Sequence, residues 1–352
     1  MTQDSQENHV LCRRFKSMMS IVLNRPRVIN SLSEDMIDRI DALLDQAIAD
    51  DQCRFVLFYS TSEKGFCAGG DVKVLARLGA RGHYEKLDSF FRKEYALDLR
   101  LHLFCKPVVV VADGITMGGG LGITAGADVR IATDRTRMAM PETRIGFFPD
   151  VGATGWMFSR CPEGYPEYLG LTGYEMQGRE CVRLGLANYY MPSGNIPLLI
   201  DALEQYEPDG RFSKEETTEK IIGKVSGYFN QVIPADQDMD RWVAKYFAGK
   251  SDLLRLLNSL SQCTEQQTHC AEVFSSINER SPTALVLALR LMRYNEGRAI
   301  TDVFATELNA ARFITRHPDY IEGIRARLID RDDRPVWKPD RINQVSLSGF
   351  VP

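Results

Sequence analysis

Residues 107–150 read PVVVVADGITMGGGLGITAGADVRIATDRTRMAMPETRIGFFPD, and this stretch decides how the rest of the chain is interpreted. It opens on an apolar run, Val108–Ala112, that is typical of a buried strand. Three consecutive glycines follow at positions 118–120, and the stretch ends with two carboxylates, Glu142 and Asp150, among apolar residues. Adjacent glycines let a ligand approach the backbone, and a carboxylate in apolar surroundings is suited to acid–base chemistry.

The chain around this stretch alternates between strand-like and helix-like segments. Residues 17–24, 55–59 and 129–133 are predicted strands. Between the first two, apolar residues recur at three- and four-residue spacing from Met36 to Ile48, which predicts an amphipathic helix. Ser31-x-x-Glu34 before it predicts a capping box. Such alternation favours an α/β fold with parallel strands.

Composition divides the chain into three parts. Residues 1–193 are expected to form the core that carries the site, and a helical pattern is predicted within it at residues 173–186. Residues 194–249 are charged and glycine-containing without clear periodicity, which indicates a connecting or lid region. Residues 250–352 are predicted to be helical, and one of their helices has Ser281 as its N-cap and Pro282 at its first position.

Charge and residue usage narrow the class of protein. The 352 residues carry a net charge of −4 with scattered Lys and Arg, so no nucleic-acid partner is expected. The eight cysteines form no CxxC pair and are predicted to be reduced. No apolar run approaches the ~18 residues of a membrane span, and the polar N-terminus lacks signal-peptide character. We therefore expect a cytoplasmic protein without membrane contact.

Several common sites are absent from the sequence. There is no GxSxG, HExxH or GxxxxGK[ST] motif, and the five histidines lack metal-ligand spacing, so no metal is expected. Gly120-x-Gly122-x-x-Ala125 fits a dinucleotide fingerprint. However, the five residues 113–117 separate the preceding strand from the consecutive glycines, which is too long for the tight turn that this motif needs, and a dinucleotide is not expected.

Two glycine-containing loops, at residues 67–71 and 117–121, each follow a predicted strand. One backbone N–H from each loop could converge on a single oxygen and form an oxyanion hole; the alternative is that these glycines only make turns. Glu142 and Asp150 are the candidate acid–base pair, because apolar neighbours raise the pKa of a carboxyl group. The alternative for each is a helix cap or a surface salt bridge.

Four segments together resemble the crotonase (enoyl-CoA hydratase/isomerase) superfamily: residues 23–26 (LNRP), 65–71 (GFCAGGD), 114–120 (GITMGGG) and 141–152 (PETRIGFFPDVG). Within it, residues 90–95 (FFRKEY), 140–152 and 328–339 (LIDRDDRPVWKP) are most similar to the 3-hydroxyisobutyryl-CoA hydrolase subfamily. The resemblance implies an α/β fold, with a ββα spiral core and a helical C-terminal region.

The resemblance also implies an acyl-CoA substrate, with CoA as part of that substrate and no separate cofactor. The N–H groups of Gly70 and Gly119 would bind the thioester oxygen. Glu142 and Asp150 would be the functional carboxylates. Glu94 would contact the acyl group. The adenine and pantetheine path would be lined by Ala68 and by the loop from Arg25 to Val28. Superfamily members are often trimers or dimers of trimers, so a homo-oligomer is compatible with the resemblance.

Two positions depart from related patterns. A hydratase has a second catalytic Glu two residues after the glycine triplet, where this chain has Gly122. Lys93 replaces the acidic residue that the hydrolase pattern has before Glu94, and a charge change there could retune Glu94. Gly122 fits the hydrolase pattern, which favours cleavage of a short 3-hydroxyacyl-CoA in valine catabolism. The alternatives are an enoyl-CoA hydratase or isomerase and a non-catalytic acyl-CoA-binding protein.

Overall fold

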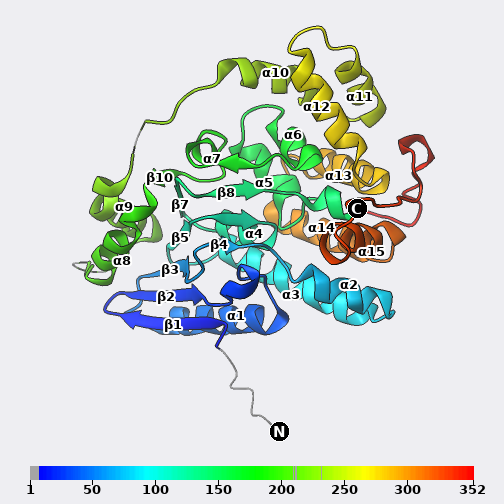
Figure 1. Ribbon diagram of the computed structural model, residues 1–352. Coiled ribbons are helices and arrows are strands. Elements are labelled where there is room, and N and C mark those ends of the chain that lie inside the picture. The colour runs from blue at the N-terminus through cyan, green and yellow to red at the C-terminus, as the bar shows by residue number, and fades with distance from the viewer. Residues whose placement is uncertain (1–7, 209, 211, 231) are drawn as a thin grey trace.

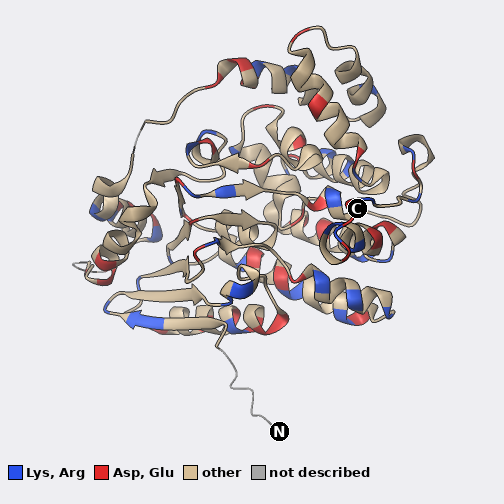
Figure 2. Cartoon of the chain, in the orientation of Figure 1, with Lys and Arg blue, Asp and Glu red and all other residues tan. Residues whose placement is uncertain are grey.

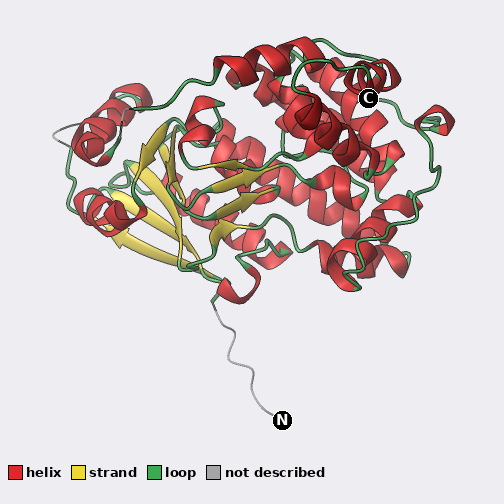
Figure 3. Cartoon of the chain, turned by 45° about the horizontal axis from the view of Figure 1, so that its top comes forward, coloured by secondary structure: helices red, strands yellow, loops and turns green. Residues whose placement is uncertain are grey.

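Two β-sheets form the centre of the molecule (Figures 1 and 3). The computed structural model describes residues 8–208, 210, 212–230 and 232–352. The large sheet has the order β1-β2-β3-β5-β7-β10 and the small sheet the order β4-β6-β8-β9. The strands are β1 (Val10–Phe15), β2 (Met18–Leu23), β3 (Phe55–Ser60), β4 (Gly65–Cys67), β5 (Val108–Ala112), β6 (Ile115–Met117), β7 (Val129–Thr133), β8 (Arg137–Ala139), β9 (Met176–Gln177) and β10 (Tyr189–Met191).

Helices surround the sheets and make up the C-terminal region. The helices of the core are α1 (Glu34–Ala49), α2 (Val72–Ala80), α3 (Tyr84–His102), α4 (Gly119–Ala125), α5 (Ala153–Arg160), α6 (Tyr165–Thr172) and α7 (Arg179–Arg183). Those that follow are α8 (Ile196–Glu204), α9 (Lys214–Val225), α10 (Gln237–Phe247), α11 (Leu253–Ser261), α12 (Gln267–Asn278), α13 (Pro282–Asn295), α14 (Ile300–Ile314) and α15 (Pro318–Ile324).

The connectivity is a repeated ββα unit. Three times in succession a strand of the large sheet is followed by one of the small sheet and then by helix: β3, β4 and α2–α3; β5, β6 and α4; β7, β8 and α5–α6. Neighbouring strands are parallel except at the two antiparallel pairs β1–β2 and β8–β9. This arrangement confirms the predicted α/β spiral. It also brings the ends of successive parallel strands to the same edge of each sheet.

The large sheet is covered on both faces, which explains why β2 and β5 are buried throughout and apolar except at Ser20. One face packs on the main core beneath α1 and α3. The other face is covered by α8 and α9, at the left of Figure 1. The residues that α8 and α9 bury there are Leu199, Leu203, Ile221 and Val225.

The described residues of segment 194–249, which was predicted as a connecting or lid region, include the α-helices α8, α9 and α10. After α9 the chain runs to α10, which packs on α6 through the ring contacts of Trp242 and Phe247 with Tyr168. None of the described residues of this segment lines the cavity described below. Its role as a lid stays a prediction.

Two local predictions were wrong. Ser33, rather than Ser31, caps α1, and its hydroxyl accepts a hydrogen bond from the N–H of Met36. Residues 173–186 form the short strand β9 and the short helix α7 instead of one helix, with Gly178 (φ 53°) between them. In contrast, Ser281 caps α13 as predicted by accepting from the N–H of Ala284.

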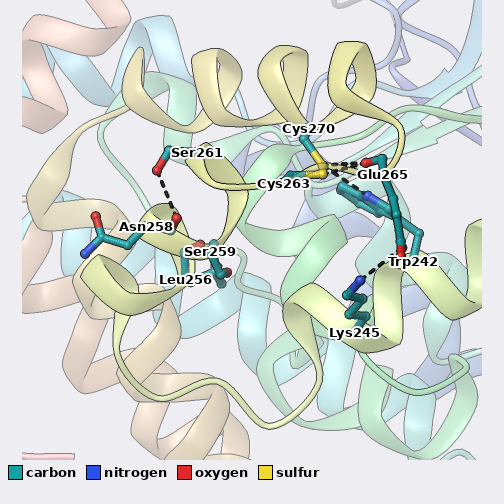
Figure 4. Close-up of a disulfide and its surroundings, with 9 residues drawn as sticks. All are labelled: Trp242, Lys245, Leu256, Asn258, Ser259, Ser261, Cys263, Glu265 and Cys270. Carbon is teal, nitrogen blue, oxygen red and sulfur yellow. Dashed lines mark hydrogen bonds and ion pairs between the residues drawn. A yellow bond between two sulfur atoms is a disulfide. The ribbon is translucent and has the colours of Figure 1, made fainter.

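The expectation that all cysteines are reduced was also wrong, because Cys263 and Cys270 form a disulfide (Figure 4). Their Cα atoms lie 6.3 Å apart, across the turn that joins α11 to α12. The indole N–H of Trp242 on α10 donates to the sulfur of Cys270 at 3.3 Å. Six cysteines remain free.

Basic and acidic residues are interspersed along the helices (Figure 2). The absence of a nucleic-acid partner stays a prediction. Across the described residues, no helix is long and apolar enough to cross a membrane.

Candidate active site

A cavity of about 230 Å³ lies where the two glycine loops, α3, the turn of residues 141–150 and α15 meet. Six of the eight site residues predicted from the sequence line it: Ala68, Gly70, Glu94, Gly119, Glu142 and Asp150. The apolar wall comes from α2, α3, the same turn and the C-terminal region: Val72, Leu75, Phe90, Phe91, Phe147, Tyr320 and Leu328.

The two glycine loops lie directly against each other. The parallel pairing of β4 with β6 ends both strands at the same edge of the small sheet. A Cβ on Gly69, whose φ is +93°, would stand 3.3 Å from the backbone nitrogen of Gly119. In the described part of the chain, the N–H groups of Gly70 and Gly119 donate to no other group. Both glycines line the cavity and neither N–H is engaged elsewhere in the described chain, as an oxyanion hole at this place requires.

Glu94 on α3 lies against both glycines. A Cβ on Gly119 would come within 2.3 Å of Glu94 Oε1, and a Cβ on Gly70 would lie 3.7 Å from the same atom. A side chain at position 119 would therefore have to displace this carboxyl group. Burial raises the pKa of Glu94 well above its usual range, and the charge of Asp150 raises it further.

Glu142 begins a 3₁₀ turn, Glu142–Ile145, and is 7% exposed. Its Oε1 would lie 3.1 Å from a Cβ on Gly118, so a second carboxyl group, besides that of Glu94, reaches the second glycine loop. Burial raises the pKa of Glu142 well above its ordinary value, and Asp150 adds to the rise. Raising the pKa of a carboxyl group makes its ionised form a stronger base.

Asp150 accepts a hydrogen bond of 2.8 Å from the phenol of Tyr95. Burial raises the pKa of Asp150 to about 7, and the Tyr95 hydrogen bond works in the opposite direction because it stabilises the ionised form. Sequence reasoning missed Tyr95, although it follows Glu94 directly. Its contact with Asp150 spans 55 residues and depends on packing between α3 and the later turn.

Glu307 on α14 was also missed, and it holds the turn that follows Asp150. Its carboxyl group is fully buried and accepts from the backbone N–H of Gly152 at 2.6 Å and of Thr154 at 3.1 Å. Val151, which lies between Asp150 and Gly152, has a positive φ of 53°, an unfavourable conformation for a β-branched side chain. The C-terminal region thus fixes the backbone on which Asp150 is carried.

The remaining predicted residues lie beside the cavity rather than in it. Arg25 and Val28 line a separate surface cavity of about 650 Å³. Arg25 pairs with Asp71 at 2.8 Å, and the N–H of Ala68 donates to the carbonyl of Ile29. Arg25 therefore braces the first glycine loop, and contact of Arg25 and Val28 with CoA stays a prediction.

Two further sequence interpretations can now be judged. Lys93 points away from the cavity and pairs with Glu34 and Asp38 of α1 at 2.8 and 2.7 Å, so it does not retune Glu94.

The dinucleotide-like glycines lie inside the fully buried helix α4. A Cβ on Gly120 would come within 2.3 Å of the carbonyl oxygen of Cys67, so this glycine serves packing.

Comparison with known proteins gives consistent matches over almost the whole chain. The family model described as "Enoyl-CoA hydratase/isomerase" matches residues 18–350. The mitochondrial 3-hydroxyisobutyryl-CoA hydrolase of Gallus gallus is 36% identical over 93% of this chain and 83% of its own length. A small ribosomal subunit protein of Neurospora crassa is 32% identical, covering 97% of this chain and 70% of its own.

A solved structure supports the same relationship. The crystal structure of a carnitinyl-CoA dehydratase from Mycobacterium thermoresistibile superimposes with a TM-score of 0.86 and is 29% identical. The match covers 98% of this chain and 97% of the dehydratase.

The cytoplasmic location expected from the sequence is contradicted by the relatives. The hydrolases of Gallus gallus and of further vertebrates are named as mitochondrial proteins. Charge and hydropathy of a short N-terminal stretch were an insufficient basis for the expectation, because they do not by themselves decide the compartment.

Proposed function

The chain belongs to the enoyl-CoA hydratase/isomerase family of acyl-CoA-processing enzymes, and on this premise we propose that it hydrolyses a short 3-hydroxyacyl-CoA thioester. The preferred substrate is 3-hydroxyisobutyryl-CoA, whose hydrolysis in valine catabolism yields 3-hydroxyisobutyrate and CoA. On the same basis we propose a mitochondrial location. The observation that carries the proposal is the convergence of Glu142, Asp150 and both glycine loops on one cavity.

The glycine loops would act on the developing negative charge. The thioester carbonyl oxygen would accept hydrogen bonds from the N–H groups of Gly70 and Gly119. These donors are held in place by folded backbone, so they need no reorganisation as charge moves onto the oxygen. Removing one donor from a comparable oxyanion hole costs about 10²- to 10³-fold in kcat.

Glu142 would act on the carbonyl carbon by one of two routes. As a nucleophile, its carboxylate attacks the carbon, the carbon–sulfur bond breaks, and water then hydrolyses the mixed anhydride. As a general base, it takes a proton from water as that water attacks. In either route Asp150, with a pKa of about 7, can deliver a proton to the departing thiolate or orient the substrate hydroxyl.

Label from ¹⁸O-water separates these routes. Incorporation of label into Glu142 during multiple turnovers supports the anhydride, whereas label found only in the product supports the general base. The variant Glu142→Gln should lower kcat by roughly 10²-fold or more, because it removes either function. Near-normal turnover by this variant would exclude Glu142 from the chemistry.

A second candidate is hydration or dehydration of an enoyl-CoA, which the name of the superimposed dehydratase favours. Gly122 stands against it, because adding water across a double bond needs two positioned acid–base groups. Free thiol release from 3-hydroxyisobutyryl-CoA, measured beside loss of enoyl absorbance from crotonyl-CoA, decides between the two reactions.

A third candidate is a non-catalytic acyl-CoA-binding or scaffold protein, which the ribosomal relative favours. The buried carboxyl groups of the cavity stand against it, because burying them is costly and a scaffold does not need them. Binding of CoA esters without turnover, together with co-sedimentation with mitochondrial ribosomes, would support this candidate.

A further inference from the structure

Helix α15, from the C-terminal region, is seated directly on the turn that carries Glu142. A Cβ on Gly146, whose φ is +72°, would come within 2.2 Å of the carbonyl oxygen of Asp319. A Cβ on Gly323 would come within 2.4 Å of the carbonyl carbon of Ile145. The backbones of helix and turn therefore touch at two glycines, which fixes α15 relative to Glu142.

The first turn of α15 is anchored from two other directions. The hydroxyl of Ser281 donates to Asp319 Oδ2 at 2.6 Å, and the backbone N–H of Lys338 donates to Asp319 Oδ1 at 2.8 Å. Asp319 is fully buried. The next residue, Tyr320, is thus presented to the cavity from a rigid support.

Tyr320 is 1% exposed and lines the cavity, where its ring packs on Phe147 at a centroid distance of 5.6 Å. Its hydroxyl has no hydrogen-bond partner among the described residues. A buried hydroxyl is costly to leave unpaired, and most such groups in folded proteins have a partner. Burial raises the pKa of Tyr320, as do the charges of Asp150 and Glu94, so the group stays an O–H donor.

The polar side chains of the cavity are strongly unbalanced. Of the described lining residues, Glu94, Glu142 and Asp150 supply carboxyl groups, and Tyr320 supplies the one side-chain hydroxyl. Glu94 Oε1 is buried and also lacks a partner in the described chain. A substrate hydroxyl is both a donor and an acceptor, so a carboxyl oxygen that accepts from it and a phenol that donates to it supply a partner for each role.

We propose that Tyr320 is a specificity-determining residue that donates a hydrogen bond to the hydroxyl of the 3-hydroxyacyl group while Glu94 accepts from it. The inference rests on the proposed function and identifies what selects hydroxylated acyl groups. An acyl group without the hydroxyl would leave both Tyr320 and Glu94 unpaired. Sites built to hydrogen-bond a hydroxyl discriminate against the analogue that lacks it for this reason.

The test uses two stable ligands in which a methylene group replaces the thioester sulfur of 3-hydroxyisobutyryl-CoA and of isobutyryl-CoA. Both ligands are ketones that cannot be hydrolysed. Titration calorimetry should show that the wild-type protein binds the hydroxylated ketone, derived from 3-hydroxyisobutyryl-CoA, more tightly than the deoxy ketone derived from isobutyryl-CoA. Tyr320→Phe should weaken binding of that ligand roughly 3- to 10-fold, the worth of one neutral hydrogen bond, and leave the deoxy ligand within about twofold. Tyr168→Phe, a buried tyrosine of α6 outside the cavity, should change neither.

Equal weakening of both ligands by Tyr320→Phe, or no weakening of either, would overturn the proposal. So would a wild-type protein that shows no preference for the hydroxylated ketone, a result that does not depend on how the variant folds. Binding requires no turnover, so the outcome is separate from the proposed hydrolysis. Absence of thiol release from every ester tested would overturn hydrolysis while this preference could still be present.

Discussion

The carboxyl group of Asp98 occupies the space beside Gly122: a Cβ on Gly122 would stand 2.7 Å from Asp98 Oδ2. The same Cβ would stand 2.8 Å from the Cβ of Val151. Asp98 lies one helical turn after Glu94 on α3 and is 1% exposed. Position 122, where a hydratase carries its second glutamate, is therefore closed to any side chain by packing.

Gly122→Ala should lower the free energy of unfolding by about 1–3 kcal/mol, because overpacked cores must displace their neighbours. Urea denaturation measures the effect. The matched control is Gly223→Ala in α9, where a Cβ would meet nothing within 4 Å. That change should be neutral or stabilise by up to about 1 kcal/mol through helix propensity. A Gly122→Ala protein as stable as wild type would show that the site has room for a side chain.

Tyr95→Phe should raise the pKa of Asp150 above about 7, because the hydrogen bond that it removes stabilises the ionised carboxylate. The limb of the kcat–pH profile that reports Asp150 should move to higher pH by about one unit, since one unit corresponds to about 1.36 kcal/mol. Tyr174→Phe, whose hydroxyl contacts Glu180 instead, should leave the limb in place. A downward shift for Tyr95→Phe would contradict the assignment.

Glu307 should make the protein less stable as the pH rises. Burial raises its pKa from 4.5 to about 8, against the opposing hydrogen bond from Thr154. Between these values the unfolded chain has lost a proton that the folded chain keeps, so stability falls with rising pH. Glu307→Gln removes this one-proton difference between the folded and unfolded chains. The decrease of the unfolding free energy with pH should therefore become less steep by about 1.4 kcal/mol per pH unit between pH 5 and 7. An unchanged slope would show that Glu307 ionises normally.

Lys93→Gln should leave kcat/KM within about twofold of wild type, because Lys93 pairs with α1 and not with the cavity. Its partly exposed ion pairs should contribute less than about 1 kcal/mol to stability. The neighbouring variant Glu94→Gln, which alters a group inside the cavity, should lower kcat/KM by more than tenfold. A large loss of activity for Lys93→Gln alone would restore the idea that it tunes Glu94.

The location of the site was largely predictable from the chain. Glu142 and Asp150 are separated by eight positions in an apolar segment, and the glycine loops carry a recognisable pattern, so all four elements could be named before any contact was known. Tyr95, Glu307 and Tyr320 could not, because each reaches the site through tertiary packing. The contact of Glu307 with Gly152, for example, spans 155 residues.

The sequence by itself determined the long elements and the fold class, because hydrophobic periodicity is a local property that survives in any window of the chain. It missed β4, β6, β8, β9 and β10, since strands of two or three residues are too short to show a period, and it also missed the longer edge strand β1. Only the tertiary structure decided that the carboxyl groups of Glu94 and Glu142 lie against the second glycine loop and that the C-terminal region completes the cavity. Such relations depend on which distant surfaces bury each other, and no local pattern encodes that choice.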